Sequence, residues 1–151
     1  MAELQTIQSI IRGPVPNNST HVYRPHATER AAKYFLNNFK GTVLYAVKTN
    51  PEPYILKQVY DLGITSFDIA SLEEARQLRT LLPKADLYFM HTVKSRQAIR
   101  EAYNNMGVRA FALDSQEELK KILEETSNAK DLSLFVRLSI PNTYSEINLG
   151  K

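Results

Sequence analysis

The sequence predicts an α/β fold in which parallel (β/α) repeats form part of a TIM-type (β/α)8 barrel. Short apolar runs begin near residues 43, 64, 86, 109 and 132, and each is followed by a stretch with the apolar spacing of a helix. The steps between these runs are 21 to 23 residues, the length of one strand and one helix. The runs lack the polar alternation of a one-sided sheet, which indicates strands covered on both faces and therefore a parallel sheet.

An open doubly wound sheet and a closed barrel both fit this alternation. A barrel needs eight strands and typically about 250 residues, whereas the 151 residues of this chain supply five strands. For a barrel, we expect a chain truncated after about five strands, with the C-terminal half of the barrel absent. We expect an N-terminal arm over residues 1–25 and the partial barrel over residues 26–151.

Composition narrows the classes of function. The chain has no cysteine, which excludes disulfides and zinc–thiolate sites. The net charge is +3, but lysines and arginines are scattered among acids, so we predict neither a nucleic-acid partner nor a membrane-binding patch. Residues 1–12 lack the charged start and long apolar core of a signal peptide, and no apolar run could span a membrane. We therefore expect a cytoplasmic enzyme or binding domain.

The arm and the first helix come before the repeats. Gly13 and Pro16 interrupt any regular pattern in the arm, in which Val22–Tyr23 is a candidate strand. Thr28 suits the N-cap of a helix, and Gly41 suits its end. That helix would bury one apolar stripe, made of Ala31, Ala32, Phe35, Leu36 and Phe39.

The repeats follow in order. The predicted strands are 43–47, 64–70, 87–90, 110–113 and 132–140. Pro51 and Pro53 open the first helix between them, and the next helices begin near Ser71, Ser95 and Ser115. Two of these starts have the spacing of a capping box, formed by Ser71 with Glu74 and by Ser115 with Glu118.

An ionisable residue lies at or near the C-terminal end of every predicted strand. These residues are Lys48, Asp68, His91, Asp114 and Arg137. In parallel α/β folds this edge of the sheet binds ligands and carries catalysis. Any one of the five is more often simply the polar residue at which a strand ends, and the aspartates also suit the start of a helix. The complete set favours a functional site.

Lys48 is the most informative of the five, because it follows five apolar residues. We expect its amine to lie against an apolar wall, where desolvation would lower its pKa and enlarge the neutral fraction. A neutral amine attacks an aldehyde, and Asp68 on the next strand could position it. The alternative is a lysine that extends from the strand end into water.

Other sites lack support. The five glycines form neither a dinucleotide-binding nor a phosphate-binding loop. The three histidines lack the spacing of metal ligands, so no metal site is predicted.

The stretch Tyr45–Asn50, with the sequence YAVKTN, resembles the pyridoxal-phosphate attachment motif of the ornithine/diaminopimelate/arginine decarboxylase family. The likeness continues through Phe67–Ser71, Phe111–Ser115 and Val136–Leu138, in order along the chain. It spans roughly residues 20 to 151, and the ordered set is more specific than any single motif.

The resemblance implies a fold-type III barrel, like that of alanine racemase, followed by a β domain that we expect to be absent here. It implies pyridoxal 5'-phosphate as the cofactor, held as an internal aldimine on Lys48, with Asp68, His91 and Arg137 around it. The parent protein would decarboxylate a small-molecule amino acid, basic and of the ornithine or lysine type, in polyamine biosynthesis. It would act as a homodimer, and this chain alone would be inactive.

Two alternatives stay open. One keeps the barrel but makes the chain part of an amino-acid racemase or of a pyridoxal-phosphate carrier. The other is a non-catalytic half-barrel that associates with itself, because open strand edges and exposed apolar faces favour pairing with another chain.

Overall fold

A computed structural model describes residues 6–14, 17–19 and 21–139 of the chain. Helices and strands alternate after the first two helices. In order, the elements are α1 (Ile7–Arg12), α2 (Pro25–Asn38), β1 (Leu44–Ala46), the 3-10 turn η1 (Val47–Thr49), α3 (Pro53–Asp61), β2 (Ser66–Ile69), α4 (Leu72–Leu81), β3 (Asp86–Phe89), α5 (Arg96–Met106), β4 (Ala110–Leu113), α6 (Gln116–Glu125) and β5 (Ser133–Val136).

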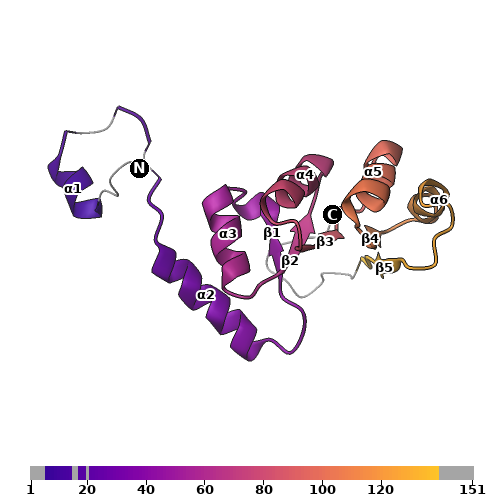
Figure 1. The fold of residues 1–151 in the computed structure, drawn as a ribbon, viewed down its shortest axis with the longest axis horizontal. Coiled ribbons are helices and arrows are strands. Elements are labelled where there is room, and N and C mark those ends of the chain that lie inside the picture. Colours follow the sequence, from indigo (N-terminus) through magenta and orange to yellow (C-terminus); the bar gives the residue numbers. More distant parts are fainter. Residues whose placement is uncertain (1–5, 15–16, 20, 140–151) are drawn as a thin grey trace.

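The five strands form one parallel sheet in the order β1-β2-β3-β4-β5, which confirms the predicted (β/α) repeats. Every strand pairs with the next one along the chain, whereas a doubly wound sheet reverses its strand order part-way. Helices α4, α5 and α6 stand along one side of the sheet in Figure 1. Sequential order with helices on one side is the arrangement of a barrel wall.

The core lies between this sheet and its helices. Phe67, Phe89 and Phe111 occupy neighbouring strands and are fully buried, and the rings of Phe89 and Phe111 stack with their centres 6.2 Å apart. The helices meet them with four fully buried side chains, Leu56, Leu78, Ile99 and Ile122. Burying an apolar side chain of this size contributes about 1.5–3 kcal/mol, so this layer is the main source of stability.

Serine caps fix the starts of three helices beside the C-terminal edge of the sheet. The side chains of Ser71, Ser95 and Ser115 accept hydrogen bonds from the backbone N–H three residues on, at 3.2, 3.1 and 3.2 Å. In the first predicted capping box Glu74 Oε2 also accepts the N–H of Ala70, at 2.6 Å. In the second, Glu118 does not return to the helix start but is buried against Lys94, so that box is only half formed.

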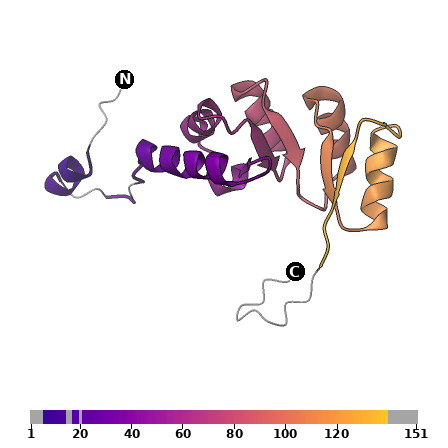
Figure 2. The ribbon, with the colours of Figure 1, turned by 90° about the horizontal axis from the view of Figure 1, so that it is seen from below.

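The N-terminal part departs from the predictions. The helix α1 lies in the predicted arm, capped by Thr6, and the candidate strand Val22–Tyr23 does not form. Instead the ring of Tyr23 lies 4.8 Å from that of Tyr54. Figures 1 and 2 both show α1 lying apart from the sheet.

The limits and the burial of α2 were also predicted wrongly. The helix begins at Pro25 rather than after Thr28, because proline already has the φ angle of a first helical turn. It ends at Asn38, three residues before Gly41. Of the predicted buried stripe only Ala32 is buried, while Phe35, Leu36 and Phe39 are 53%, 39% and 56% exposed. Phe35 faces a hollow that is also lined by Tyr45 of β1 and Val59 of α3, so these elements cover the stripe only in part.

The last strand is shorter than predicted. It ends at Val136 instead of reaching Ile140, which lies outside the described residues. Its side chains are exposed, with Val136 at 63%, because β5 is an edge strand that pairs only with β4 in the described sheet.

Candidate functional site

A cavity of about 330 Å³ lies at the C-terminal edge of the sheet, and all four predicted site residues line it. Lys48, Asp68, His91 and Arg137 come from the ends of β1, β2, β3 and β5, so residues far apart in sequence meet at one place. The remaining lining residues are Ala70, Met90, Ala112, Phe135 and Val136. We call this the strand-end cavity.

The strand register explains why the edge is hollow there. Asp68 is level with Ala46 on one side and with Tyr88 on the other, and Ala112 is level with Phe135. These side chains occupy the face of the sheet opposite the three buried phenylalanines, because successive residues of a strand point to opposite faces. The small side chain of Ala112 at this face leaves space, and Phe135, whose ring meets that of Tyr88 edge-on with centres 6.1 Å apart, lines the cavity.

Lys48 lies in η1, just beyond the end of β1. The neighbouring Val47 is fully buried and anchors the turn, and the hydroxyl of Tyr45 donates to the carbonyl of Asn50 at 3.2 Å across it. Lys48 itself is exposed. The expectation of an amine pressed against an apolar wall is therefore wrong for the described structure, because the strand ends at Ala46 and Lys48 lines the cavity as an exposed side chain.

Asp68 lies on β2, is half-buried, and lines the cavity. Burial raises the pKa of its carboxyl above the ordinary value, and nearby Glu74 adds to that rise. The positive charges of Lys48 and Arg137 act in the opposite direction on the same pKa. The carboxyl thus lies within electrostatic reach of both cations.

His91 and Arg137 lie at the rim. Both are exposed; Arg137 directly follows the last residue of β5, and His91 lies two residues beyond the end of β3. The backbone N–H of Arg137 donates to the carbonyl of Leu113 at 2.8 Å, which holds the residue in line with β5. Asp114, the fifth residue of the predicted set, is exposed and does not line the strand-end cavity.

Sequence reasoning missed Lys94, the one buried lysine among the described residues. Its ammonium lies 2.9 Å from Glu118 Oε1 as an ion pair and donates to the carbonyls of His91 and Ala112, at 2.9 and 2.6 Å. Burial lowers the pKa of Lys94, and Glu118 opposes that shift. A signal existed, because Glu118 precedes the core residue Ile122 by one helical turn and so faces inward, where a carboxylate needs a partner.

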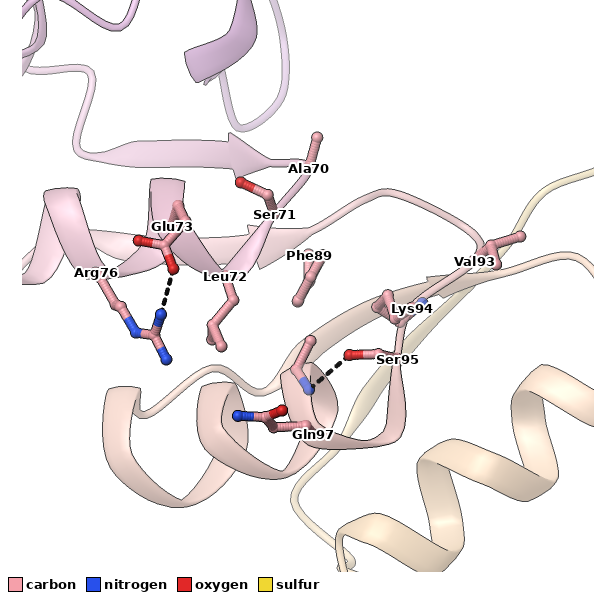
Figure 3. A pocket seen from close by; sticks show the side chains of 11 residues that line it. Ala70, Ser71, Leu72, Glu73, Arg76, Phe89, Val93, Lys94, Ser95 and Gln97 are labelled. Atoms are coloured by element: carbon pink, nitrogen blue, oxygen red, sulfur yellow. Dashed lines mark hydrogen bonds and ion pairs between the residues drawn. The ribbon is translucent and has the colours of Figure 1, made fainter.

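A second hollow, of about 380 Å³, lies between the first turns of α4 and α5 (Figure 3). Ser71 and Ser95, the two helix caps, line it together with Lys94. At its surface Glu73 and Arg76 form an ion pair. None of the four predicted site residues lines this hollow.

Within the part of the chain that the structure describes, no three histidine, aspartate or glutamate side chains gather closely enough to hold a metal ion. In the same residues no helix has both the length and the apolar character needed to cross a membrane.

Known proteins share this fold and sequence. A family model described as "Pyridoxal-dependent decarboxylase, pyridoxal binding domain" matches residues 25–150. The lysine/ornithine decarboxylase of Selenomonas ruminantium is 31% identical over 114 residues, which are 74% of this chain and 27% of that protein. The solved arginine decarboxylase of Paramecium bursaria Chlorella virus, bound to agmatine, has a TM-score of 0.66 and 30% identity over 78% of this chain and 32% of its own. The solved ornithine decarboxylase of Entamoeba histolytica has a TM-score of 0.65 and 30% identity, over 76% of this chain and 34% of its own.

The chain thus spans about a third of the length of these relatives, between 27% and 34%. The agreement confirms the predicted partial barrel, which corresponds to the N-terminal part of these decarboxylases. It also confirms the family that the motif around Lys48 resembles. The chain therefore belongs to the pyridoxal-dependent decarboxylases, within their pyridoxal-binding domain, and its cofactor is pyridoxal phosphate.

Proposed function

We propose that this chain forms the cofactor-binding part of an enzyme that decarboxylates a basic amino acid, with pyridoxal phosphate attached to Lys48. The observation that carries the proposal is the strand-end cavity, in which one lysine, one half-buried aspartate, one histidine and one arginine meet. The relatives named above are decarboxylases of lysine, ornithine or arginine, which supports a substrate with a cationic side chain.

The residues present fit the cofactor. The cavity volume of about 330 Å³ falls within the range of small-molecule sites, about 300–1,000 Å³. Ala70 and Ala112 contribute small apolar side chains to the cavity lining, against which a pyridine ring could pack. Lys48 makes no ion pair among the described residues and is exposed, so its amine can reach an aldehyde. Arg137 offers a cation to an anionic group.

When bound, pyridoxal phosphate supplies an acceptor for the electrons that a departing carboxylate leaves behind. Lys48 is the residue that would hold the cofactor, and its amine is the group that would carry a proton to and from the site. Asp68, whose pKa is raised by burial, holds either a proton or a negative charge beside Lys48 and orients its amine. His91 and Arg137 at the rim orient the cofactor or the substrate carboxylate.

The finer assignments extend the proposal. We assign the enzyme to polyamine biosynthesis, with ornithine or lysine as substrate, because loss of carbon dioxide from either amino acid leaves a diamine. We also assign it to the cytoplasm and to a homodimer. Exposed Leu134, Phe135 and Val136 on β5 support association with further protein surface, because an open apolar strand edge favours pairing.

The test is to mix the chain with pyridoxal phosphate, reduce with borohydride, and map the labelled peptides by mass spectrometry. We expect Lys48 to be labelled ahead of Lys84, an exposed surface lysine. In the variant Lys48→Arg we expect no label on the peptide that carries position 48. Equal labelling of Lys48 and Lys84 would contradict the proposal that Lys48 belongs to a preformed cofactor site. Release of carbon dioxide from ornithine, lysine and arginine by a longer form of the protein then decides the substrate.

A further inference from the structure

Lys94 is a buried cation that belongs to no surface network. Its side chain is fully buried, and that of Glu118, its ion-pair partner, is 4% exposed. An ammonium group has three N–H donors. Three oxygens lie within 2.9 Å of Nζ, those of the His91 carbonyl, the Ala112 carbonyl and the Glu118 carboxylate. The two carbonyls accept hydrogen bonds from the ammonium group, whereas Glu118 Oε1 is held as an ion pair and accepts no hydrogen bond.

Two of these acceptors belong to residues that line the strand-end cavity. His91 follows β3 and carries a predicted site side chain, and Ala112 on β4 forms part of the cavity wall. Lys94 lies three residues beyond His91, in the connection to α5. Its hydrogen bonds thus close the loop on itself and fasten it to the neighbouring strand.

Stability alone is a weak reason for such a pair. Burying two charges costs several kcal/mol, and apolar replacements of similar volume are often neutral or stabilising. Two residues further on, Arg96 already joins α5 to α6 through ion pairs with Glu124 and Glu125. What distinguishes Lys94 is that its other two bonds end on the cavity wall.

We propose that Lys94 is a positioning residue of the strand-end cavity, whose ammonium group holds the His91 backbone against β4 and so sets where the His91 side chain lies. Glu118 balances the charge that this requires, and Lys121 contacts the second oxygen of Glu118, at 2.6 Å. The part that concerns pyridoxal phosphate rests on the proposed function, whereas the placement of His91 does not.

The experiment compares Glu118→Gln with the double variant Lys94→Met/Glu118→Gln. The single change removes the ion pair but leaves Lys94 to donate to both carbonyls, and the double change removes those donors without leaving a buried charge. The histidine ring signals of the chain are read by NMR, where only three histidines contribute. The affinity for pyridoxal phosphate is read by absorbance titration. Arg96→Met is the control, because the Arg96 side chain is 55% exposed and Glu125, the more buried of its two partners, keeps its ion pair with Arg100.

We expect the His91 signals to shift and broaden only in the double variant. We also expect its affinity for pyridoxal phosphate to fall about tenfold below that of Glu118→Gln, since small misplacement of a site group has effects of this order or larger. Unchanged His91 signals with affinity within about twofold of Glu118→Gln would overturn the proposal. If the double variant does not fold, Lys94→Arg replaces it in the comparison, because arginine keeps the positive charge but not the compact ammonium group. Unchanged His91 signals in Lys94→Arg would also overturn the proposal.

Failure of the proposed function gives a different pattern. If the unaltered chain takes up no pyridoxal phosphate, that function fails, while the comparison of His91 signals still tests the role of Lys94.

Discussion

The middle of the sheet and its two margins follow the same apolar pattern but differ in burial. Strands β2 to β4 bury Phe67, Phe89 and Phe111 completely, whereas Leu134, the residue of β5 that is level with Phe111, is 39% exposed. At the other margin α2 exposes most of the stripe that its spacing predicts to be buried. An apolar pattern therefore shows which side chains can be buried, and a neighbouring element decides which of them are.

The largest expected contrast is between Phe111→Ala and Phe135→Ala. We expect the free energy of unfolding to fall by about 4 kcal/mol for Phe111, because a large cavity opens in a filled core. For Phe135 we expect a loss of about 1 kcal/mol or less, because the ring is already partly in water. Urea unfolding measures both, and equal losses would show that β5 is as well packed as β4.

A second contrast sets the buried cation against an exposed one. Lys94→Met leaves Glu118 buried without its main partner, and we expect a loss of about 3 kcal/mol. Arg96→Met removes contacts with Glu124 and Glu125 at the surface, which contribute about 0–1 kcal/mol. Thermal unfolding at low and high salt separates the two, because salt screens only the surface pair. A Lys94 variant as stable as the Arg96 variant would mean that water reaches Glu118.

Helix caps offer a third, smaller contrast. Ser95 caps α5 within the packed layer, and Ser95→Ala should cost about 1 kcal/mol. Thr6 caps α1, which is six residues long and apart from the sheet, so Thr6→Ala should leave the unfolding midpoint unchanged. Circular dichroism during urea unfolding reports both changes. A measurable loss for Thr6→Ala would show that α1 docks on the domain.

The smallest expected effect concerns the pH dependence of Asp68. Burial raises the pKa of its carboxyl in the folded chain above the ordinary 3.8. The protonated form is therefore favoured by folding, so its contribution to stability is complete below about 3.8 and is lost as pH rises through the folded value. As the pH is raised from about 3 to about 7, we therefore expect the free energy of unfolding of Asp68→Asn to rise relative to that of the unaltered chain.

The matched control for that measurement is Asp114→Asn, which changes the same charge at an exposed strand end. An equal gain in both variants would mean that net charge, rather than the burial of Asp68, is responsible.

Much of the fold followed from sequence pattern, because it depends on local rules. The starts of α4, α5 and α6 were predicted from serines that do cap them, and the central strands from short apolar runs. Four ionisable residues that line the strand-end cavity, Lys48, Asp68, His91 and Arg137, were predicted because parallel strands bring their C-terminal ends together, whereas Asp114 does not line it.

The errors arose where the outcome depends on distant residues. Lys48 follows five apolar residues that suit a strand. In the structure a 3-10 turn begins at Val47, whose side chain is fully buried in the core. Glu118 was assigned to a local capping box, yet a lysine 24 positions earlier attracts it. Spacing along one helix cannot reveal a partner contributed by another loop.

The consecutive strand order also bears on how the chain reaches this structure. Each strand finds its partner in the next repeat, so that Phe67, for example, pairs with Leu87 about twenty residues on. Closing so short a loop costs little entropy, and contacts that are near in sequence favour rapid folding. Each unit can therefore dock as it emerges during synthesis, with the sheet growing from β1 toward β5, and the cavity at its edge is assembled only when the last strand arrives.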